Sequence, residues 1–230
     1  MLLTIPSVIS PADCKDIYQQ LCSAEWTDGR ETVGHLGAQV KRNLQLPESS
    51  LVRAQLGQRI LDSLSKCPLF FAATLPQHIL PPRFNCYQDS GTYGLHVDGA
   101  VMSLPGHQGQ ATQSMRSDIS CTVFLSDPSS YVGGELVIAD TYGEHSVKLP
   151  AGDAIIYPSS SLHKVTPVTQ GRRISAFFWL QSTVRYPHQR QMLFELDQVI
   201  QRLHTQPGME NEAVHLACVY HNLLREWAYA

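Results

Sequence analysis

The sequence predicts a mainly β fold, a sandwich or a barrel, with α-helices before and after it. Over residues 76–182, short runs rich in β-branched and aromatic residues, such as "DISCTVFLSD" and "RRISAFFWLQS", alternate with clusters of Gly, Pro, Asp and Ser. Strands separated by turn signals at intervals of about ten to fifteen residues are typical of all-β folds rather than of βαβ units. Helical periodicity appears on both sides of this region. The chain therefore divides into 1–75, a β core over 76–182, and 183–230.

The first segment, residues 1–75, is predicted to supply helices that support the β core. A helix should begin at Ser10, whose hydroxyl can cap it, with Pro11 and Asp13 in the first turn. Its apolar stripe is formed by Cys14, Ile17, Leu21 and Cys22. The stretch "SSLVRAQLGQRILDSLSKCP" predicts a second helix. The expected inner face of this helix consists of Leu51, Ala54, Ile60, Leu61 and Leu64.

The last segment, residues 183–230, is predicted to form two helices separated by a break at "TQPGMEN". Apolar residues recur at helical spacing on both sides of the break: Met192, Leu193, Leu196, Val199, Ile200 and Leu203, then Val214, Ala217, Cys218, Leu224 and Trp227. Such faces can cap the barrel or form the interface of a homodimer, and the sequence leaves both open.

One stretch inside the β region, "GAVMSLPGHQGQATQSM" at residues 99–115, has no apolar period. Loops of this length are uncommon in compact domains and often form lids or binding loops. We expect a lid, because the stretch directly follows His96 and Asp98; the alternative is a flexible insertion. His107 within it is the one other histidine that could approach the site.

Composition and charge restrict the class of protein. The chain has 230 residues, of which 43% are hydrophobic and 16% charged, and a formal net charge of −3, as in an ordinary globular protein. No basic run exceeds two residues, so nothing predicts nucleic acid as a partner. No segment approaches the ~18 apolar residues of a membrane span. The start of the sequence is also a poor signal peptide.

The six cysteines are scattered, with no CxxC pair and no spacing typical of a disulfide framework. Three of them lie in apolar patterns, which predicts buried free thiols. Free thiols indicate a reducing compartment, so we expect a cytoplasmic protein.

The stretch "TYGLHVDG" places His96 and Asp98 two residues apart. On a β-strand such residues point to the same face, so both could bind one metal ion. Alone, the pair is equally compatible with the exposed face of a strand. His163, at the start of "LHKVTPV", is the best candidate for a third ligand. Two imidazoles and one carboxylate leave metal positions open, an arrangement that suits non-haem Fe(II) oxygenases.

Ten residues after His163 comes Arg173, on the same strand face as Ser175, Phe177 and Trp179. If that face is the barrel interior, the guanidinium needs an anion, because an unpaired buried charge is very costly. A carboxylate ligand could supply the anion, and so could an acidic residue of the protein itself. Arg172 would then point outward.

Three stretches, "YGLHVD", "GGELVI" and "AGDAIIYPSSSLHKVTPVTQGRR", resemble the bacterial PKHD-type hydroxylases, relatives of prolyl and lysyl hydroxylases among the Fe(II)/2-oxoglutarate dioxygenases. The resemblance extends from "KRNLQL" to "LFELDQVI". It implies a double-stranded β-helix (jelly-roll) core with N-terminal and C-terminal helices. It also implies a metal triad of His96, Asp98 and His163, with Arg173 binding the distal carboxylate of 2-oxoglutarate. By position Tyr87 would contact this cosubstrate; the alternative is an ordinary core tyrosine.

The reaction that this resemblance implies is hydroxylation of a C–H bond with Fe(II), O₂ and 2-oxoglutarate, releasing succinate and CO₂, with L-ascorbate as an accompanying reductant. The substrate, a peptide or a small molecule, is not readable from the sequence. Gly99 stands where relatives often carry Asn, which removes any basis for transferring substrate specificity. We assign Gly133 and Gly134 a structural role and expect Arg116 to be solvated rather than to bind substrate.

Two other functions remain open from the sequence. One is a cupin-type Zn or Mn metalloenzyme, which would need no Arg173 anchor. The other is a non-catalytic barrel that binds iron or a ligand. The complete triad together with Arg173 argues against both.

Overall fold

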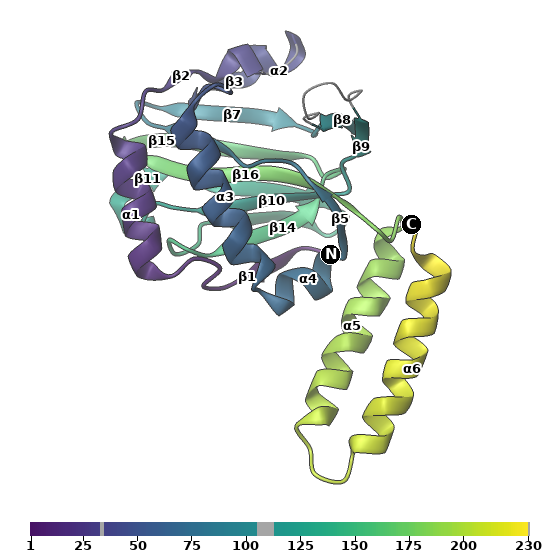
Figure 1. The fold of residues 1–230 in the computed structure, drawn as a ribbon. Coiled ribbons are helices and arrows are strands. Elements are labelled where there is room, and N and C mark those ends of the chain that lie inside the picture. The colour runs from purple at the N-terminus through teal and green to yellow at the C-terminus, as the bar shows by residue number, and fades with distance from the viewer. Residues whose placement is uncertain (33–34, 105–112, 230) are drawn as a thin grey trace.

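The computed structural model describes residues 1–32, 35–104 and 113–229. Two antiparallel β-sheets face each other, and a layer of helices covers one of them. A pair of long helices at the C-terminal end projects away from these layers (Figure 1). The mainly β architecture with helices at both ends of the chain agrees with the prediction.

The larger sheet has the strand order β1-β14-β10-β16-β6-β4-β2, and β5 also pairs with β16. Its strands are β1 (Leu3–Ile5), β2 (Thr27–Asp28), β4 (Leu44–Gln45), β5 (Pro76–Ile79), β6 (Arg83–Tyr87), β10 (Ile119–Phe124), β14 (Ala154–Pro158) and β16 (Arg173–Ser182). Three of these strands, β1, β2 and β4, come from residues 1–75. The N-terminal segment therefore extends the sheet as well as supporting it with helices, which the helical periodicity of the sequence did not indicate.

The second sheet has the order β13-β12-β15-β7-β3, and β11 also pairs with β15. Its strands are β3 (Lys41–Arg42), β7 (Gly91–His96), β11 (Tyr131–Gly133), β12 (Leu136–Asp140), β13 (Gly143–Val147) and β15 (His163–Gly171). The chain passes from this sheet to the larger one between β3 and β4, with only Asn43 between the two strands. This short crossing brings the two sheets together at one edge.

Helices pack on the outer face of the larger sheet. They are α1 (Pro11–Cys22), α3 (Leu51–Ser65) and α4 (Pro68–Thr74). As predicted, the Ser10 hydroxyl caps α1 by accepting a hydrogen bond from the Asp13 amide at 3.1 Å. Alternate residues of β16, such as Ile174 and Phe178, are buried in the same core cluster as the apolar faces of α1 and α3. The larger sheet therefore has one face against helices and the other toward the interior.

The space between the sheets holds a second core cluster, to which both sheets contribute. Its members include Tyr87, Phe124, Ile155 and Tyr157 from the larger sheet and Leu136, Ile138, Val165 and Val168 from the smaller one. Arg173 and Ser175, on the inward side of β16, are also fully buried here. Alternation along β16 thus places polar groups inside the barrel and apolar groups against the helices.

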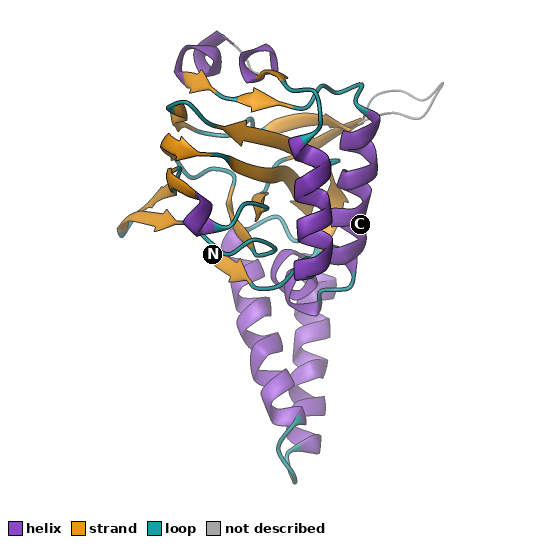
Figure 2. Ribbon diagram, turned by 90° about the vertical axis from the view of Figure 1, so that its left-hand side faces the viewer, coloured by secondary structure: helices purple, strands orange, loops and turns teal. Residues whose placement is uncertain are grey.

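The C-terminal helices α5 (Pro187–His204) and α6 (Glu210–Trp227) form an antiparallel hairpin (Figure 2). Its base is held by a small buried cluster of Leu75, Val184 and Leu193, with Trp227 packed against it. A bridge between Val184 and Ala228 joins the end of the hairpin to its beginning. No helix in the described part of the chain is long and apolar enough to cross a membrane.

The stretch at 99–115 differs from the prediction of an irregular loop. Residues Val101–Leu104 (β8) and Gln113–Arg116 (β9) pair in a two-stranded sheet of their own, and Met115 is buried. The strands are too short for alternation to be read from the sequence. Residues 105–112, including His107, lie outside the described residues, so the expectation of a lid there remains an expectation.

The remaining short helices are η1 (Gly29–Thr32), α2 (His35–Val40) and η2 (Pro128–Ser130). All six cysteines are free thiols, and Cys14, Cys86 and Cys121 are buried. Cys22 is wrong as a member of the apolar stripe of α1, because its side chain is exposed. Leu51 and Ala54 are wrong as core residues: Leu51 is 78% exposed and Ala54 is also exposed. The buried face of α3 includes Leu56, Ile60 and Leu64.

Candidate metal centre

The backbone brings the two predicted histidines together directly. His96 is the last residue of β7, and His163 is the first residue of β15. The two residues are register partners in this antiparallel pair, and their ring centroids lie 4.2 Å apart. Side chains of opposed residues in an antiparallel ladder share a face, so strand pairing alone converges two imidazoles that are far apart in the chain.

Asp98 lies two residues beyond the end of β7 rather than on a strand, yet it still joins the histidines. Its side chain is 10% exposed, and its Oδ2 atom lies 3.7 Å from Nε2 of His163. One donor atom from each of His96, Asp98 and His163 lies within 4.8 Å of the others. Among the described residues these three form the one group of His, Cys, Asp or Glu that could hold a metal ion.

Both imidazoles are fixed by backbone carbonyl groups. Nδ1 of His96 lies 2.8 Å from the Gly94 oxygen, and Nδ1 of His163 lies 3.0 Å from the Ser161 oxygen. A carbonyl oxygen can only accept, so each Nδ1 carries the proton and each Nε2 presents a lone pair. Burial, and next the neighbouring His163, lower the pKa of His96 to about 4. The neutral form of His96, the form that binds metals, is therefore favoured.

The carboxylate is oriented from the opposite sheet. The Ser120 hydroxyl, on β10, donates to Oδ2 of Asp98 at 2.6 Å. The Ser159 hydroxyl lies 2.8 Å from that of Ser120, and because the Ser120 proton already goes to Asp98, Ser159 is the donor to Ser120. The hydrogen bonds from Ser159 to Ser120 and from Ser120 to Asp98 hold the carboxylate in one orientation. Hydrogen bonds of this kind orient and tune metal ligands in proteins.

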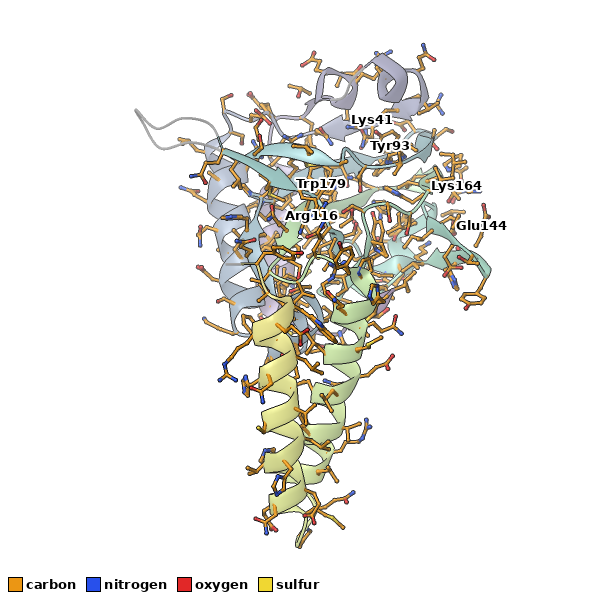
Figure 3. All side chains as sticks on the ribbon, turned by 90° about the vertical axis from the view of Figure 1, so that its right-hand side faces the viewer. Lys41, Tyr93, Arg116, Glu144, Lys164 and Trp179 are labelled. Atoms are coloured by element: carbon orange, nitrogen blue, oxygen red, sulfur yellow. The ribbon has the colours of Figure 1, made fainter. Side chains whose placement is uncertain are left out.

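Two aromatic rings lie against the histidines of the triad, and a lysine lies against one of these rings. The Tyr93 ring stacks on His96 with centroids 3.6 Å apart, and the Tyr157 ring meets His163 edge-on at 5.1 Å. The Lys41 ammonium lies 5.2 Å from the Tyr93 ring centroid, and Figure 3 shows Lys41 and Tyr93 above Trp179. Burial, and then Arg83, lower the pKa of Lys41 to about 8.

Arg173 lies deeper in the barrel and is 1% exposed. Its guanidinium lies 5.3 Å from the ring centroid of Tyr87 and 5.2 Å from that of Phe124. Nη1 donates to the Ser175 hydroxyl at 2.8 Å, and this hydroxyl donates to Oδ1 of Asn85 at 2.5 Å. Asn85 in turn donates to the Tyr87 hydroxyl at 3.4 Å, so a polar chain connects Arg173 to Tyr87.

The surroundings of Arg173 test whether an anionic ligand fits. Within the described ranges, no ion pair within 4.0 Å involves Arg173, so no carboxylate of the protein neutralises it there. Its Nε atom has no hydrogen-bond partner, and neither do the buried Tyr131 hydroxyl and Asn43 amide. Buried polar groups are normally paired. The Nε–H of Arg173 and the hydroxyl of Tyr131, which packs beside it, are donors that a small dicarboxylate would satisfy, so the residues present fit 2-oxoglutarate.

The other residues singled out by sequence have structural contacts. Arg172 is half-buried and donates to Oε1 of Gln88 at 2.9 Å. Arg116 forms a two-point ion pair with Asp118, with contacts of 2.6 and 2.9 Å, rather than a free solvated charge. Gly133 and Gly134 both have positive φ, and a Cβ on Gly133 would lie 2.0 Å from the Pro167 oxygen, which supports their structural role.

Sequence reasoning missed Ser120, Asn43 and Tyr131. Ser120 is brought to Asp98 by the fold, and Tyr131 and Asn43 lie in segments without a recognisable spacing. The local signal for Tyr131 was its position just before the double glycine, in "SSYVGG".

Solved structures with a similar fold include two prolyl hydroxylases and HygX. A Trichoplax adhaerens prolyl hydroxylase in complex with a hypoxia-inducible-factor peptide aligns with a TM-score of 0.55, 13% identity, and coverage of 84% of this chain and 86% of that one. HygX from Streptomyces hygroscopicus, with nickel, 2-oxoglutarate and hygromycin B bound, aligns with a TM-score of 0.53 and 15% identity, and the alignment covers 79% of this chain and 83% of that one. A Pseudomonas putida prolyl-4-hydroxylase aligns with a TM-score of 0.51 and 16% identity, and the alignment covers 79% of this chain and 92% of that one. These similarities establish the jelly-roll fold.

The sequence pattern of the 2OG-Fe(II) oxygenase superfamily matches residues 82–181, the region that carries the triad and Arg173. Fold and site thus define an oxygenase that depends on Fe(II) and 2-oxoglutarate. The PKHD-type hydroxylase C-terminal domain matches residues 188–229, the helical hairpin. A PKHD-type hydroxylase of Xylella fastidiosa (strain 9a5c) is 60% identical over 99% of both chains, and one of Stenotrophomonas maltophilia (strain R551-3) is 58% identical over the same share. The chain belongs to the PKHD-type hydroxylases.

Family membership confirms the predicted reaction class. The protein is a hydroxylase that couples oxidation of 2-oxoglutarate to succinate and CO₂ with hydroxylation of a C–H bond. The cupin-type metalloenzyme and the non-catalytic barrel, both left open by the sequence, are not supported.

Proposed function

We propose that His96, Asp98 and His163 hold the Fe(II) ion of this hydroxylase, and that Arg173 and Tyr87 bind 2-oxoglutarate beside it. The observation that carries the proposal is the convergence of one donor atom from each of the three ligands within 4.8 Å. The Nε2 lone pairs of two neutral imidazoles and one carboxylate form the donor set that Fe(II) takes in such oxygenases.

When bound, the iron and 2-oxoglutarate supply the oxidising chemistry, while the protein supplies binding and orientation. Three protein ligands would leave further positions on the ion for the cosubstrate and O₂. Arg173 would fix the far carboxylate of 2-oxoglutarate, and Ser175 and Asn85 would hold the guanidinium and the Tyr87 hydroxyl in place. The apolar walls formed by Phe124, Tyr157 and Val168 would keep bulk water out of the interior.

The test compares single substitutions of the ligands with a matched histidine elsewhere. We expect His96→Ala, Asp98→Ala and His163→Ala to weaken Mn(II) binding by at least two orders of magnitude, because each removes one of three ligands. Binding is followed by the loss of free-Mn(II) signal in electron paramagnetic resonance. Succinate formation from 2-oxoglutarate should fall to background in the same variants.

The control is His145→Ala, which removes an exposed imidazole that bonds to Asp140 at 2.9 Å on β12–β13. It should keep wild-type Mn(II) affinity and succinate formation. Wild-type Mn(II) affinity in any of the three ligand variants would contradict the assignment of that residue.

Finer aspects of the function are part of the same proposal. The substrate is a peptide or a small molecule, and a peptide and an aminoglycoside are bound by structural neighbours of this fold. L-Ascorbate would keep the iron reduced, as the reaction class suggests. Free thiols support a cytoplasmic location. Exposed apolar side chains on the hairpin, Met192, Val214 and Val219, support a homodimer through α5 and α6.

A further inference from the structure

Three buried side chains in the described part of the chain carry polar atoms without a hydrogen-bond partner. They are Arg173, through Nε, the Tyr131 hydroxyl, and the Asn43 amide. Tyr131 is 3% exposed and Arg173 is 1% exposed, so bulk water does not satisfy these atoms. An unmade hydrogen bond in such a place destabilises the folded state, and proteins retain such groups mainly where a ligand completes them.

Tyr131 and Arg173 are immediate neighbours. Both pack on the bare Cα of Gly134, where an added Cβ would lie 2.9 Å from Cδ of Arg173 and 3.0 Å from Cε2 of Tyr131. Gly134 has φ +69°, so its conformation and the space beside it both favour glycine. The double glycine therefore does more than turn the chain, because it lets the Tyr131 ring and the Arg173 side chain approach each other.

The Tyr131 ring is held from its other side. The Lys148 ammonium lies 4.0 Å from the ring centroid and donates to the Tyr131 carbonyl at 2.8 Å. Tyr131 also pairs with Gly171, two residues before Arg173, in the β11–β15 ladder. These contacts fix the ring and the backbone of Tyr131, and its hydroxyl lies close enough to interact with Arg173. Burial raises the pKa of Tyr131, so this hydroxyl keeps its proton and can donate it.

The two tyrosines near Arg173 are not equivalent. Tyr87 presents its ring face to the guanidinium, and its hydroxyl already accepts a hydrogen bond from Asn85. The hydroxyl of Tyr131 has no such partner in the described chain. Glu135, the acidic residue near Arg173, accepts a hydrogen bond from Thr166 instead. A ligand with two acceptor oxygens would satisfy the Arg173 Nε–H and the Tyr131 O–H together.

We propose that the Tyr131 hydroxyl is a direct hydrogen-bond donor to the distal carboxylate of 2-oxoglutarate, beside Arg173. The proposal rests on the proposed function, because it takes Arg173 as the anchor of that carboxylate. It adds a binding residue from β11, a strand to which neither the triad nor Arg173 belongs. Tyr131 would thus help the site to select a keto acid with a second carboxylate.

The test uses two ligands that differ only at the distal end. 2-Oxoglutarate carries the second carboxylate, and 2-oxovalerate has the same five-carbon keto acid chain without it. Dissociation constants for both are measured by isothermal titration calorimetry on the Mn(II)-loaded protein. We expect Tyr131→Phe to raise the dissociation constant of 2-oxoglutarate by about 10- to 100-fold, the usual range for a hydrogen bond to a charged group. The dissociation constant of 2-oxovalerate should stay unchanged.

Tyr157→Phe is the matched control. It removes the hydroxyl of a tyrosine that is also buried in the core between the sheets, but that lies next to His163 rather than Arg173. We expect the ratio of the two dissociation constants to stay at the wild-type value. Arg173→Gln should reduce the preference for 2-oxoglutarate more strongly than Tyr131→Phe does.

A second readout does not depend on any ligand. Because the hydroxyl is unpaired, the ligand-free Tyr131→Phe protein should be at least as stable to urea as the wild type. Lower stability would mean that the hydroxyl already has a partner within the protein, and would overturn the proposal. The proposal would also be overturned if Tyr131→Phe kept the wild-type ratio of the two dissociation constants while Arg173→Gln lost the preference for 2-oxoglutarate. That result would still support Arg173 as the anchor. Unchanged ratios in both variants would instead contradict the proposed function.

Discussion

At the scale of single residues, the proposed metal centre depends on groups that would not touch the ion. The carbonyl groups of Gly94 and Ser161 select the tautomer of each histidine, and Ser120 orients the carboxylate. Each carbonyl lies two residues before its histidine, on the same strand or in the turn that leads into it. The local backbone conformation thus prepares both imidazoles before any metal arrives.

Ser120→Ala tests the contribution of the serine. Without the donor at 2.6 Å, Oδ2 of Asp98 loses its fixed orientation, and we expect Mn(II) affinity to fall about 10- to 100-fold. Electron paramagnetic resonance titration measures this change. Ser126→Ala is the control, because Ser126 is equally buried and accepts a hydrogen bond from the Ile174 amide away from the triad. The prediction is wrong if both variants lose the same affinity.

Some residues of the candidate site could be identified from the sequence, and others only from the structure. The order and spacing of His96, Asp98, His163 and Arg173 are visible in the sequence as a motif. Alternation along a strand explains the inward side of Arg173 but not the position of Asp98, which lies beyond the end of β7. Tyr131, Asn43 and Ser120 come from strand pairing between distant segments. No local pattern encodes that pairing, so these residues could be identified only in three dimensions.

At the scale of elements, α3 shows where periodicity was misread. Leu56, Ile60 and Leu64 recur every four residues and define the buried face. Leu51 lies five residues before Leu56, which rotates it by about 140° from that face. The sequence predicted the helix correctly, but several apolar residues on its first turns allowed more than one choice of inner side.

Replacing leucine by alanine at a buried and at an exposed position of α3 tests which face of the helix packs against the core. Leu64→Ala removes a side chain that is 1% exposed and should lower the free energy of unfolding by about 2–5 kcal/mol. Leu51→Ala changes a side chain that is 78% exposed and should alter it by less than about 0.5 kcal/mol. Urea unfolding followed by circular dichroism gives both values. Similar losses for the two variants would mean that Leu51 packs against another surface.

Some strands were also predicted from the sequence, and others were not. Those between β5 and β16 lie in the region where the sequence predicted them, since turn signals and β-branched runs mark them clearly. The two- and three-residue strands β1 to β4 were not predicted, because they are shorter than any periodicity. They owe their strand character to the sheet edges on which they pair.

At the scale of the whole molecule, a bound ion would connect parts that are otherwise separate. His96 and His163 belong to the smaller sheet, and Asp98 is held by Ser120 of the larger one. An ion at the triad would therefore connect the two sheets. Binding of this kind stabilises the folded state in proportion to the logarithm of ion concentration.

We expect Mn(II) at about 100 times its dissociation constant to add about 2.7 kcal/mol of stability. For a chain of this size that corresponds to a rise in Tm of about 5–10 °C. Differential scanning calorimetry with Mn(II) or with EDTA measures the shift. Asp98→Ala should abolish it, and an undiminished rise in this variant would show that Mn(II) stabilises the protein elsewhere.

The helical hairpin has a consequence of a different kind. The chain enters it at Val184 and leaves it at Ala228, and the Tyr229 amide donates to the Thr183 carbonyl at 2.9 Å, so both ends are fastened at one place. The turn at 205–209 is the part of the hairpin farthest from the β-sheets (Figure 1). A fluorophore or an affinity tag inserted in this turn would leave the strand ladders undisturbed. The turn is therefore a suitable handle for immobilising the enzyme through a part of the chain that lies away from the β-sheets.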